Sequence, residues 1–255
     1  MNIYMQCQFG DNSLVGIIQL LKANDVSKIN LTPYKNYIEI VAINSSHTMI
    51  ATIKFPTIGV GIKSPSPTFG CYIDTMYSKI AKIKDKWTMD FDTTANLIRC
   101  TTNSWGGCLV TDEAMIESDN NEIPDVDEEC KIGLVCNSTM LCEVLKLPII
   151  GVSKELIYNI DINPSRIELK THHEYNKTST NSFSLPLTAE NTISLPTNNI
   201  LQRLKAVQIE KILGFSSLFD VCTIAKINDN MIIRFNQSRN NIAVANIILA
   251  GSVDE

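Results

Sequence analysis

The sequence lacks any run of about 18 consecutive apolar residues, which is the length a helix needs to cross a membrane. Its N-terminus, MNIYMQCQFGDN, lacks the charged and apolar regions of a signal peptide. With 44% hydrophobic residues in a chain of 255, the protein can still bury a large core. We therefore expect a soluble, intracellular protein of one large domain or two smaller ones, with no membrane partner.

The CxxC spacing of metal and redox motifs is also absent, although the chain has eight cysteines. The nearest candidate for a metal site combines Cys136 and Cys142 with His172 and His173, but this set breaks the usual ligand spacing of zinc sites. Several cysteines lie inside apolar runs, where a thiol behaves as a small hydrophobic side chain. We therefore expect buried thiols, no metal and no cofactor.

The sequence contains no recognition-helix motif, no aromatic stacking platform and no arginine cluster suited to bidentate base contacts. The net charge of -5 gives no general attraction to polyanions. Any contact with nucleic acid must therefore come from where the cations lie. Such contacts would be made to phosphates, would not depend on sequence and would weaken steeply with salt.

Most of the chain alternates apolar and polar residues at period two, as in NYIEIVAI, LIYNIDI, SRIELKT, DVCTIAKI and NMIIRFNQ. This pattern predicts antiparallel sheets with one face in water. Four stretches instead space their apolar residues three and four apart, which predicts helices. These stretches are 12–24, 72–84, 138–147 and 198–213.

The predicted helices repeat along the chain, because each pair is about 60 residues apart and the two pairs are offset by about 126 residues. CQFGDNS and GLVCNST both place a strand before Asn-Ser at a helix start. We predict an α+β fold made by duplicating a domain with two helices packed on antiparallel sheets. Its parts are an N-terminal domain over 1–117, an acidic connector over 118–128 and a C-terminal domain over 129–255.

Basic residues gather on the four predicted helices, although the whole chain is acidic. A lysine near a helix C-terminus is stabilised by the helix dipole and normally lies in water. Because four repeat-related helices share a sign opposite to that of the chain, a common polyanionic surface is an equally good interpretation. The candidate DNA-binding residues are Lys22, Lys79, Lys82, Lys84, Lys146, Arg203, Lys205 and Lys211.

The stretch NSSH, from Asn44 to His47, sits between two predicted strands and poses the question of a catalytic serine. A nucleophilic serine needs a base, a group that orients the base and normally a glycine elbow with an oxyanion hole. No glycine elbow accompanies Ser45 and Ser46. Asparagine and hydroxyl side chains suit a turn that bonds its own backbone. We therefore predict a structural turn, no catalytic residue and no enzyme.

The order of several motifs resembles the DNA sliding clamp family of the proliferating cell nuclear antigen type. VAINSSHTMIATI is similar to the strand-turn-strand of the first clamp domain, and CYIDTMYSKIAKI is similar to its second helix. NEIPDVDEECKIGLVCNS resembles the exit of the interdomain connector, and NIILAGSVDE resembles the C-terminal strand and tail. The resemblance covers essentially the whole chain and marks it as a divergent member.

The resemblance implies a ring that encircles duplex DNA, with helices lining the hole and sheets outside. It implies ring contacts through the strands near Gly107–Ile116 and Leu169–Ser182. Where clamps have prolines around the pocket for partner peptides, this chain has Asn230 and Gly251. The implied docking residues are Ile43, His47, Ile123, Pro124, Asn230, Ile248, Leu249 and Ala250.

The implied function is that of a processivity factor in the nucleus or a viral replication compartment. Its partners would be duplex DNA, a DNA polymerase, clamp-binding peptides, a clamp loader and two further copies in a homotrimer. Three alternatives stay open. They are a checkpoint-type clamp subunit of a hetero-oligomeric ring, a monomeric viral processivity factor, and a β-rich interaction scaffold that does not bind DNA.

Overall fold

The computed structural model describes residues 4–10, 13–62, 66–83, 86–104, 107–118, 123–146, 156–173, 176–236 and 244–251. The side chains of Tyr4, 103–109, 176–180 and Lys211 lie outside this description. The chain divides into two compact units, namely Met1–Glu122 with Ile242–Val244, and Ile123–Asn241 with Ala245–Glu255. The predicted boundaries after 117 and 128 stay predictions, since the connector residues 119–122 lie outside the description.

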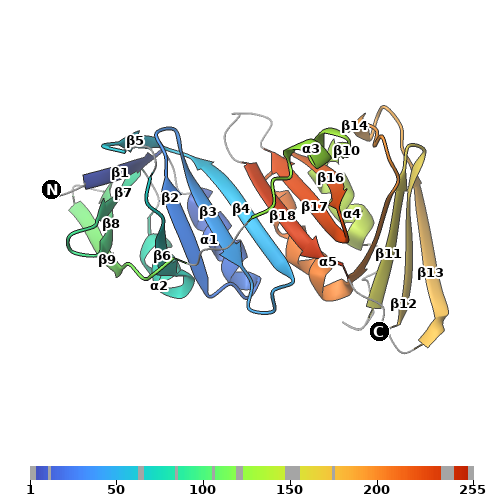
Figure 1. Ribbon diagram of the computed structural model, residues 1–255, viewed down its shortest axis with the longest axis horizontal. Coiled ribbons are helices and arrows are strands. Elements are labelled where there is room, and N and C mark those ends of the chain that lie inside the picture. The colour runs from blue at the N-terminus through green and yellow to red at the C-terminus, as the bar shows by residue number, and fades with distance from the viewer. Residues whose placement is uncertain are drawn as a thin grey trace. The chain divides into compact units, whose positions relative to one another are not determined.

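The described residues of the first unit form two helices and nine strands. Their arrangement can be followed in Figure 1. The helices are α1 (Ser13–Ala23) and α2 (Ile73–Ile80). The strands are β1 (Tyr4–Phe9), β2 (Lys28–Pro33), β3 (Tyr37–Ile43), β4 (Met49–Pro56), β5 (Ile58–Val60), β6 (Phe69–Tyr72), β7 (Trp87–Asp92), β8 (Leu97–Ser104) and β9 (Gly107–Ala114).

The second unit repeats this order behind a short extra helix, α3 (Asp127–Lys131). Its two longer helices are α4 (Ser138–Lys146) and α5 (Ala206–Leu213), and a 3-10 turn, η2, covers Phe215–Ser217. The strands are β10 (Leu134–Asn137), β11 (Leu156–Asn163), β12 (Arg166–His173), β13 (Asn176–Pro186), β14 (Thr192–Ser194), β15 (Ile200–Lys205), β16 (Val221–Ile227), β17 (Asn230–Asn236) and β18 (Val244–Ala250).

Strand pairing shows that the two units are copies of one design. In the first unit the strands lie in the orders β5-β1-β7-β8-β9 and β6-β2-β3-β4. The second unit has the matching orders β14-β10-β16-β17-β18 and β15-β11-β12-β13. Each unit is built from two βαβββ motifs, which explains the spacing of about 60 residues between helices. The predicted α+β class and the internal duplication are confirmed.

The helices form because each places an apolar stripe on the core of its unit. In α1, Leu14, Ile17, Ile18 and Leu21 are all at most 2% exposed and follow the spacing of one helix face. At the start of α4, the Asn137 Oδ1 accepts hydrogen bonds from two backbone N–H groups of the first turn. This is the capping that asparagine provides best. The predicted helices at 12–24 and 138–147 are therefore confirmed, within a residue at each end.

The predicted helix over 198–213 is wrong in its first half. Residues 200–205 form strand β15, which pairs with β11, and only Ala206–Leu213 is helical. Ile200, Gln202 and Leu204 are buried at period two, while Leu201 and Lys205 are exposed. The apolar spacing in ILQRLK fits both periods, and pairing with β11 decides for the strand.

The predicted helix over 72–84 is too long at its C-terminal end. Helix α2 ends at Ile80, so Lys82 lies in the turn after the helix. The predicted acidic connector over 118–128 overlaps the start of the short helix α3, whose first turn carries Asp127, Glu128 and Glu129. Carboxylates at that position are stabilised by the helix dipole. All five quoted period-two segments lie on strands, as predicted.

An arginine on β8 and another on the equivalent strand β17 mark the repeat at the level of side chains. Arg99 of β8 pairs with Asp112 of β9, with Nε 2.8 Å from Oδ1. In the second unit, Arg234 of β17 donates from Nε to Oδ1 of Asn246 of β18 at 2.8 Å. Its Nη2 donates to Asp127 of α3. Thus α3 provides the carboxylate that β18 lacks.

None of the described helices is both long and apolar enough to cross a membrane.

Candidate docking and helix surfaces

A hollow of about 720 Å³ lies on the first unit, on the face of β2 and β3 that turns away from the core. We call it the docking hollow. It contains two of the predicted docking residues, Ile43 and His47. The full lining is Ser27, Lys28, Asn30, Val41, Ile43, Asn44, Ser45, His47, Glu117 and Ser118.

Asn44 builds the turn at the rim of the docking hollow. Its side chain is buried, and its Oδ1 accepts hydrogen bonds from the backbone N–H groups of Thr48 and Met49, both at 2.9 Å. Its Nδ2 donates to the Ser46 hydroxyl at 2.8 Å. His47 is exposed and has a φ of 53°, in the left-handed region. The predicted structural role of this turn is confirmed.

Backbone pairing fixes the wall of the hollow that contains Glu117. The N–H of Gly70 donates to the carbonyl of Ile116 at 3.1 Å, and the N–H of Ile116 donates back at 2.8 Å. A Cβ on Gly70 would lie 2.8 Å from the Glu117 carbonyl and 2.9 Å from the Ile116 carbonyl. Glycine is therefore required where the segment after β9 passes β6.

The other predicted docking residues belong to the second unit and differ in exposure. Ile248 and Leu249 are 4% and 0% exposed, so their side chains form core and offer almost no surface. The carbonyl of Ala250 accepts a hydrogen bond from the Gln208 side chain at 2.7 Å. Ile123 is half-buried, Pro124 is exposed, and Asn230 begins β17.

Gly251 fits its surroundings for a steric reason. A Cβ there would lie 2.3 Å from the Asp229 carbonyl and 2.5 Å from the Gln202 amide nitrogen. Gln202 itself donates to that carbonyl at 2.9 Å. No side chain larger than hydrogen fits without displacing the turn before β17.

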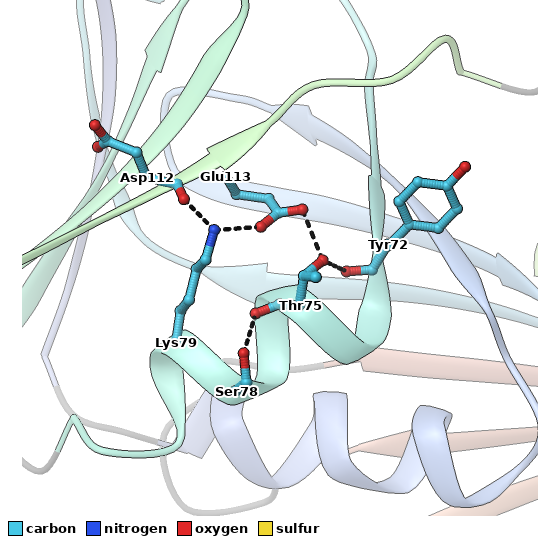
Figure 2. Close-up of polar contacts among 6 residues, drawn as sticks. All are labelled: Tyr72, Thr75, Ser78, Lys79, Asp112 and Glu113. Atoms are coloured by element: carbon cyan, nitrogen blue, oxygen red, sulfur yellow. Dashed lines mark hydrogen bonds and ion pairs between the residues drawn. The ribbon is translucent and has the colours of Figure 1, made fainter.

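The lysine of α2 that was predicted to face DNA is engaged within the first unit (Figure 2). The Nζ of Lys79 lies 2.5 Å from the Oε2 of Glu113 and also donates to the backbone carbonyl of Asp112. Thr75 donates its hydroxyl to Oε1 of Glu113 at 2.6 Å. The Glu113 side chain is only 7% exposed, so Lys79 neutralises a buried carboxylate on β9.

Lys22 is also paired, with its Nζ 2.8 Å from the Asp74 carboxylate and 5.3 Å from the centre of the Tyr77 ring. Lys82, in the turn after α2, and Lys146, the last residue of α4, are exposed. Lys84 and the side chain of Lys211 lie outside the described residues. Together α1, α2, α4 and α5 carry four lysines against three carboxylates, a weaker basic excess than the sequence predicted.

Arg203 and Lys205 lie on β15 instead of a helix. They share the sheet face that carries Leu201, while Gln202 and Leu204 turn to the core. Burial, with the nearby Glu210 carboxylate of α5, raises the pKa of Tyr158 on the core face of β11 to about 12. Helix α5 therefore packs on the core face, and the two cations lie on the opposite face.

The cysteines lie in the core, as predicted for the seven whose side chains are described. Cys136 and Cys222 face each other across β10 and β16 with their sulfurs 3.6 Å apart. Burial raises the pKa of the Cys7 and Cys100 thiols to about 12. Among the described side chains, no three histidines, cysteines or carboxylates lie where they could hold a metal ion.

The sequence indicated one end of the docking hollow and missed the rest. Val41 could have been found, since it is two residues before Ile43 on the same face of a strand. Asn30 and Glu117 carry no local signal, because only the pairing of β2 with β3 and of Gly70 with Ile116 brings them to the hollow.

No known family profile matches the sequence, and no curated protein matches it. Solved structures match over nearly the whole chain. The PCNA2–PCNA3 complex of Sulfolobus tokodaii contains a chain with a TM-score of 0.75 at 12% identity, covering 98% of this chain and all of that one. The proliferating cellular nuclear antigen of Entamoeba histolytica has a TM-score of 0.77 at 14% identity, covering 99% of this chain and all of that one. The chain thus has the sliding-clamp fold of the proliferating cell nuclear antigen type.

Proposed function

We propose that this protein is a DNA sliding clamp that encircles duplex DNA, tethers a DNA polymerase and catalyses no reaction itself. The observation that carries the proposal is the match along the entire length of solved clamp chains, with both units included. A fold alone does not define function, so the proposal also needs surfaces suited to the task. The docking hollow and the exposed helix-end lysines are the candidates for these surfaces.

Contact with DNA would be made to phosphates by Lys82 and Lys146, with Lys84 and Lys211 as further candidates. A duplex carries one negative charge per about 1.7 Å, so its electrostatic potential varies little along the axis. Lysines that contact only phosphates therefore have no preferred position along the base sequence, and the ring can slide. Because the helices carry a small basic excess, retention on DNA would depend mainly on topology. A closed ring keeps the polymerase at high effective concentration on its template.

Ring closure would pair strand edges of neighbouring copies. Strands β9 and β13 are the end strands of their sheets in the described part of each unit, so both can accept another strand. The predicted contact at Leu169–Ser182 needs one refinement, since Leu169 lies on β12 and only the later residues lie on the edge strand β13. We propose a homotrimer that acts in the nucleus or a viral replication compartment.

Size-exclusion chromatography with light scattering tests the ring. A mass three times the 28.4 kDa of the chain supports a homotrimer. A monomer contradicts it and favours a subunit of a mixed ring or a monomeric processivity factor. The mixed ring is the second candidate because the Sulfolobus tokodaii structure is a complex of two different chains.

Primer extension on circular DNA, with a polymerase and clamp loader from the same source, tests the DNA contact. We expect K82E/K146E to reduce processive synthesis, and more so at higher salt. The matched control is K35E/K54E, which makes the same charge change at exposed residues of the first unit. Equal activity of the wild type and K82E/K146E would favour a scaffold that does not touch DNA.

Partner peptides would dock in the docking hollow and along the connector. Among its lining residues, Val41 and Ile43 are aliphatic, while Lys28, Asn30 and Glu117 are polar. Together with Asn230 and Gly251, this lining predicts that a usual clamp-binding peptide binds more weakly here than to ordinary clamps. An equal or tighter affinity in calorimetry would contradict this prediction.

A further inference from the structure

The internal repeat gives the docking hollow a counterpart on the second unit. In the first unit, Asn30 of β2 stands in register between Gly70 of β6 and Val41 of β3. In the second unit, Asn159 of β11 stands in register between Arg203 of β15 and Lys170 of β12. Since β6, β2 and β3 correspond to β15, β11 and β12, these two rows are equivalent.

A separate hollow of about 400 Å³ lies over this second row, and we call it the second hollow. All of its lining residues belong to the second unit. It faces away from the core, because Ile167 and Leu169 of β12 are buried while Lys170 is exposed. The lining consists of Asn159, Ile160, Asp161, Glu168, Lys170, Leu201, Gln202 and Arg203.

The two hollows differ in chemistry at equivalent positions. The row of the first unit has Val41, which lines the docking hollow, and the small Gly70, while the equivalent positions of the second row are Lys170 and Arg203, which both line the second hollow. Arg166 and Lys205 extend the same face at the ends of their strands. On the described parts of β11, β12 and β15, this face carries these four cations and only two carboxylates, Asp161 and Glu168. It therefore has an excess of two positive charges, although the whole chain has a net charge of -5.

The carboxylates of the second hollow are not equivalent. Glu168 lies 3.0 Å from Arg166 and 2.9 Å from Lys170, and the hydrogen bond from Lys170 with both positive charges lowers its pKa. The Oδ1 of Asp161 is buried and accepts no hydrogen bond from the described residues. Leu201, beside it in register, is 56% exposed. The surface therefore offers cations and an apolar contact within one hollow.

We propose that the second hollow is a docking site for an acidic peptide segment of a partner protein, carrying an apolar residue that covers Leu201. Peptide carboxylates would meet Lys170 and Arg203, and the apolar residue of the peptide would cover Leu201. A duplex is a poorer fit, because its phosphate backbone offers no apolar group to cover the exposed Leu201. This site goes beyond the proposed clamp function and does not depend on ring formation or DNA binding.

Fluorescence anisotropy of the full chain tests the site. The probe is a labelled short peptide of aspartates and glutamates with two leucines, and the reference is the same peptide with asparagine and glutamine in place of the acids. We expect the acidic peptide to bind about tenfold more tightly than the reference. We expect K170E/R203E to abolish that preference and L201A to weaken binding several-fold.

The matched control is again K35E/K54E, which should bind as the wild type does. Because Arg203 is half-buried, R203E could disturb the fold, so K170E alone is included as a second variant. Circular dichroism checks the fold of each variant. Loss of binding in K35E/K54E equal to that in K170E/R203E would overturn the proposal, since binding would then follow net charge only. Unchanged binding in both K170E and K170E/R203E would also overturn it.

A duplex-binding assay tests whether this face binds nucleic acid instead of a peptide. If K170E/R203E weakens duplex binding as much as K82E/K146E does, the face is a nucleic-acid surface and the peptide proposal is wrong. Amide chemical shifts mapped with the peptide should move at residues 159–161 and 201–203. Shifts confined to the docking hollow would place the peptide there and contradict the proposal.

Discussion

The Nζ of Lys79 lies 2.5 Å from the Oε2 of Glu113 and joins helix α2 to strand β9. The lysine is 27% exposed and the carboxylate 7% exposed, so the pair lies at the edge of the core. Thr75 gives the carboxylate a second donor. The pair therefore fixes the end strand of a sheet to the helix that covers it.

Removing the lysine of this pair should destabilise the first unit. K79M leaves the Glu113 carboxylate buried without its counter-charge, and we expect a loss of about 2 to 3 kcal/mol in the free energy of unfolding. Chemical denaturation measures it. The double variant K79M/E113Q should recover part of the loss, because a neutral amide needs no counter-charge. A double variant as unstable as K79M would contradict this explanation.

The Arg99–Asp112 pair should make stability depend on pH in the acid range. The hydrogen bond and charge of Arg99 hold the pKa of the Asp112 carboxyl below its ordinary value of 3.8. A folded-state pKa that is lowered stabilises the protein above the ordinary value, and this contribution disappears as pH falls through the lowered one. We expect D112N to lower Tm at pH 6 and to have little effect near pH 2. R99Q should lower Tm at pH 6 in the same way, and the double variant R99Q/D112N should have a Tm no lower than that of either single variant.

Gly70 should be essential for the wall of the docking hollow. G70A places a Cβ against two carbonyls at 2.8 and 2.9 Å, and we expect a cost of about 1 to 3 kcal/mol from the forced displacement. The shift of Glu117 should also weaken binding of a clamp-binding peptide in calorimetry. G10A is the matched control, because a Cβ there meets no atom within 4 Å. Peptide affinity unchanged in G70A would show that this wall plays no part in docking.

The buried thiols should be nearly unreactive in the native protein. The pKa of Cys7 and Cys100 is raised to about 12 by burial, so very little thiolate exists at pH 8. We expect a disulfide reagent to modify them at the rate of unfolding, and rapidly in denaturant. The experiment uses C108S, because the Cys108 side chain lies outside the described residues. Fast modification of either native thiol, located by mass spectrometry, would contradict the prediction.

Much of the fold could be predicted because its elements carry local periodicity. The alternation in NYIEIVAI matches the buried positions Ile38, Ile40 and Ala42 of β3. The prediction failed at ILQRLK, where apolar residues fit both a helix and a strand. Hydrogen bonds to β11 decide between them, and a partner about 40 residues away in sequence leaves no trace in the segment itself.

Only those parts of the site that are formed by residues close together in the sequence could be predicted. The turn at Asn44 follows from residues that bond their own backbone, and it was identified correctly. The pairing of Lys79 with Glu113 joins residues 34 apart, so the lysine was assigned to DNA on its position alone. The prediction for Arg203 rested on a helix that the structure replaces with strand β15. Charge in a sequence gives sign and number, while only tertiary structure gives the direction in which the side chain points.

The contact between Arg234 and Asp127 also determines where the second half can be separated from the first. Helix α3 supplies the carboxylate for an arginine of β17, so it is a structural part of the half that follows it. A fragment beginning at Ile123 keeps this support, and one beginning at Gly133 leaves the guanidinium without it. A fragment designed to contain the second unit should therefore start ahead of α3, within the segment that the sequence predicts to be a connector.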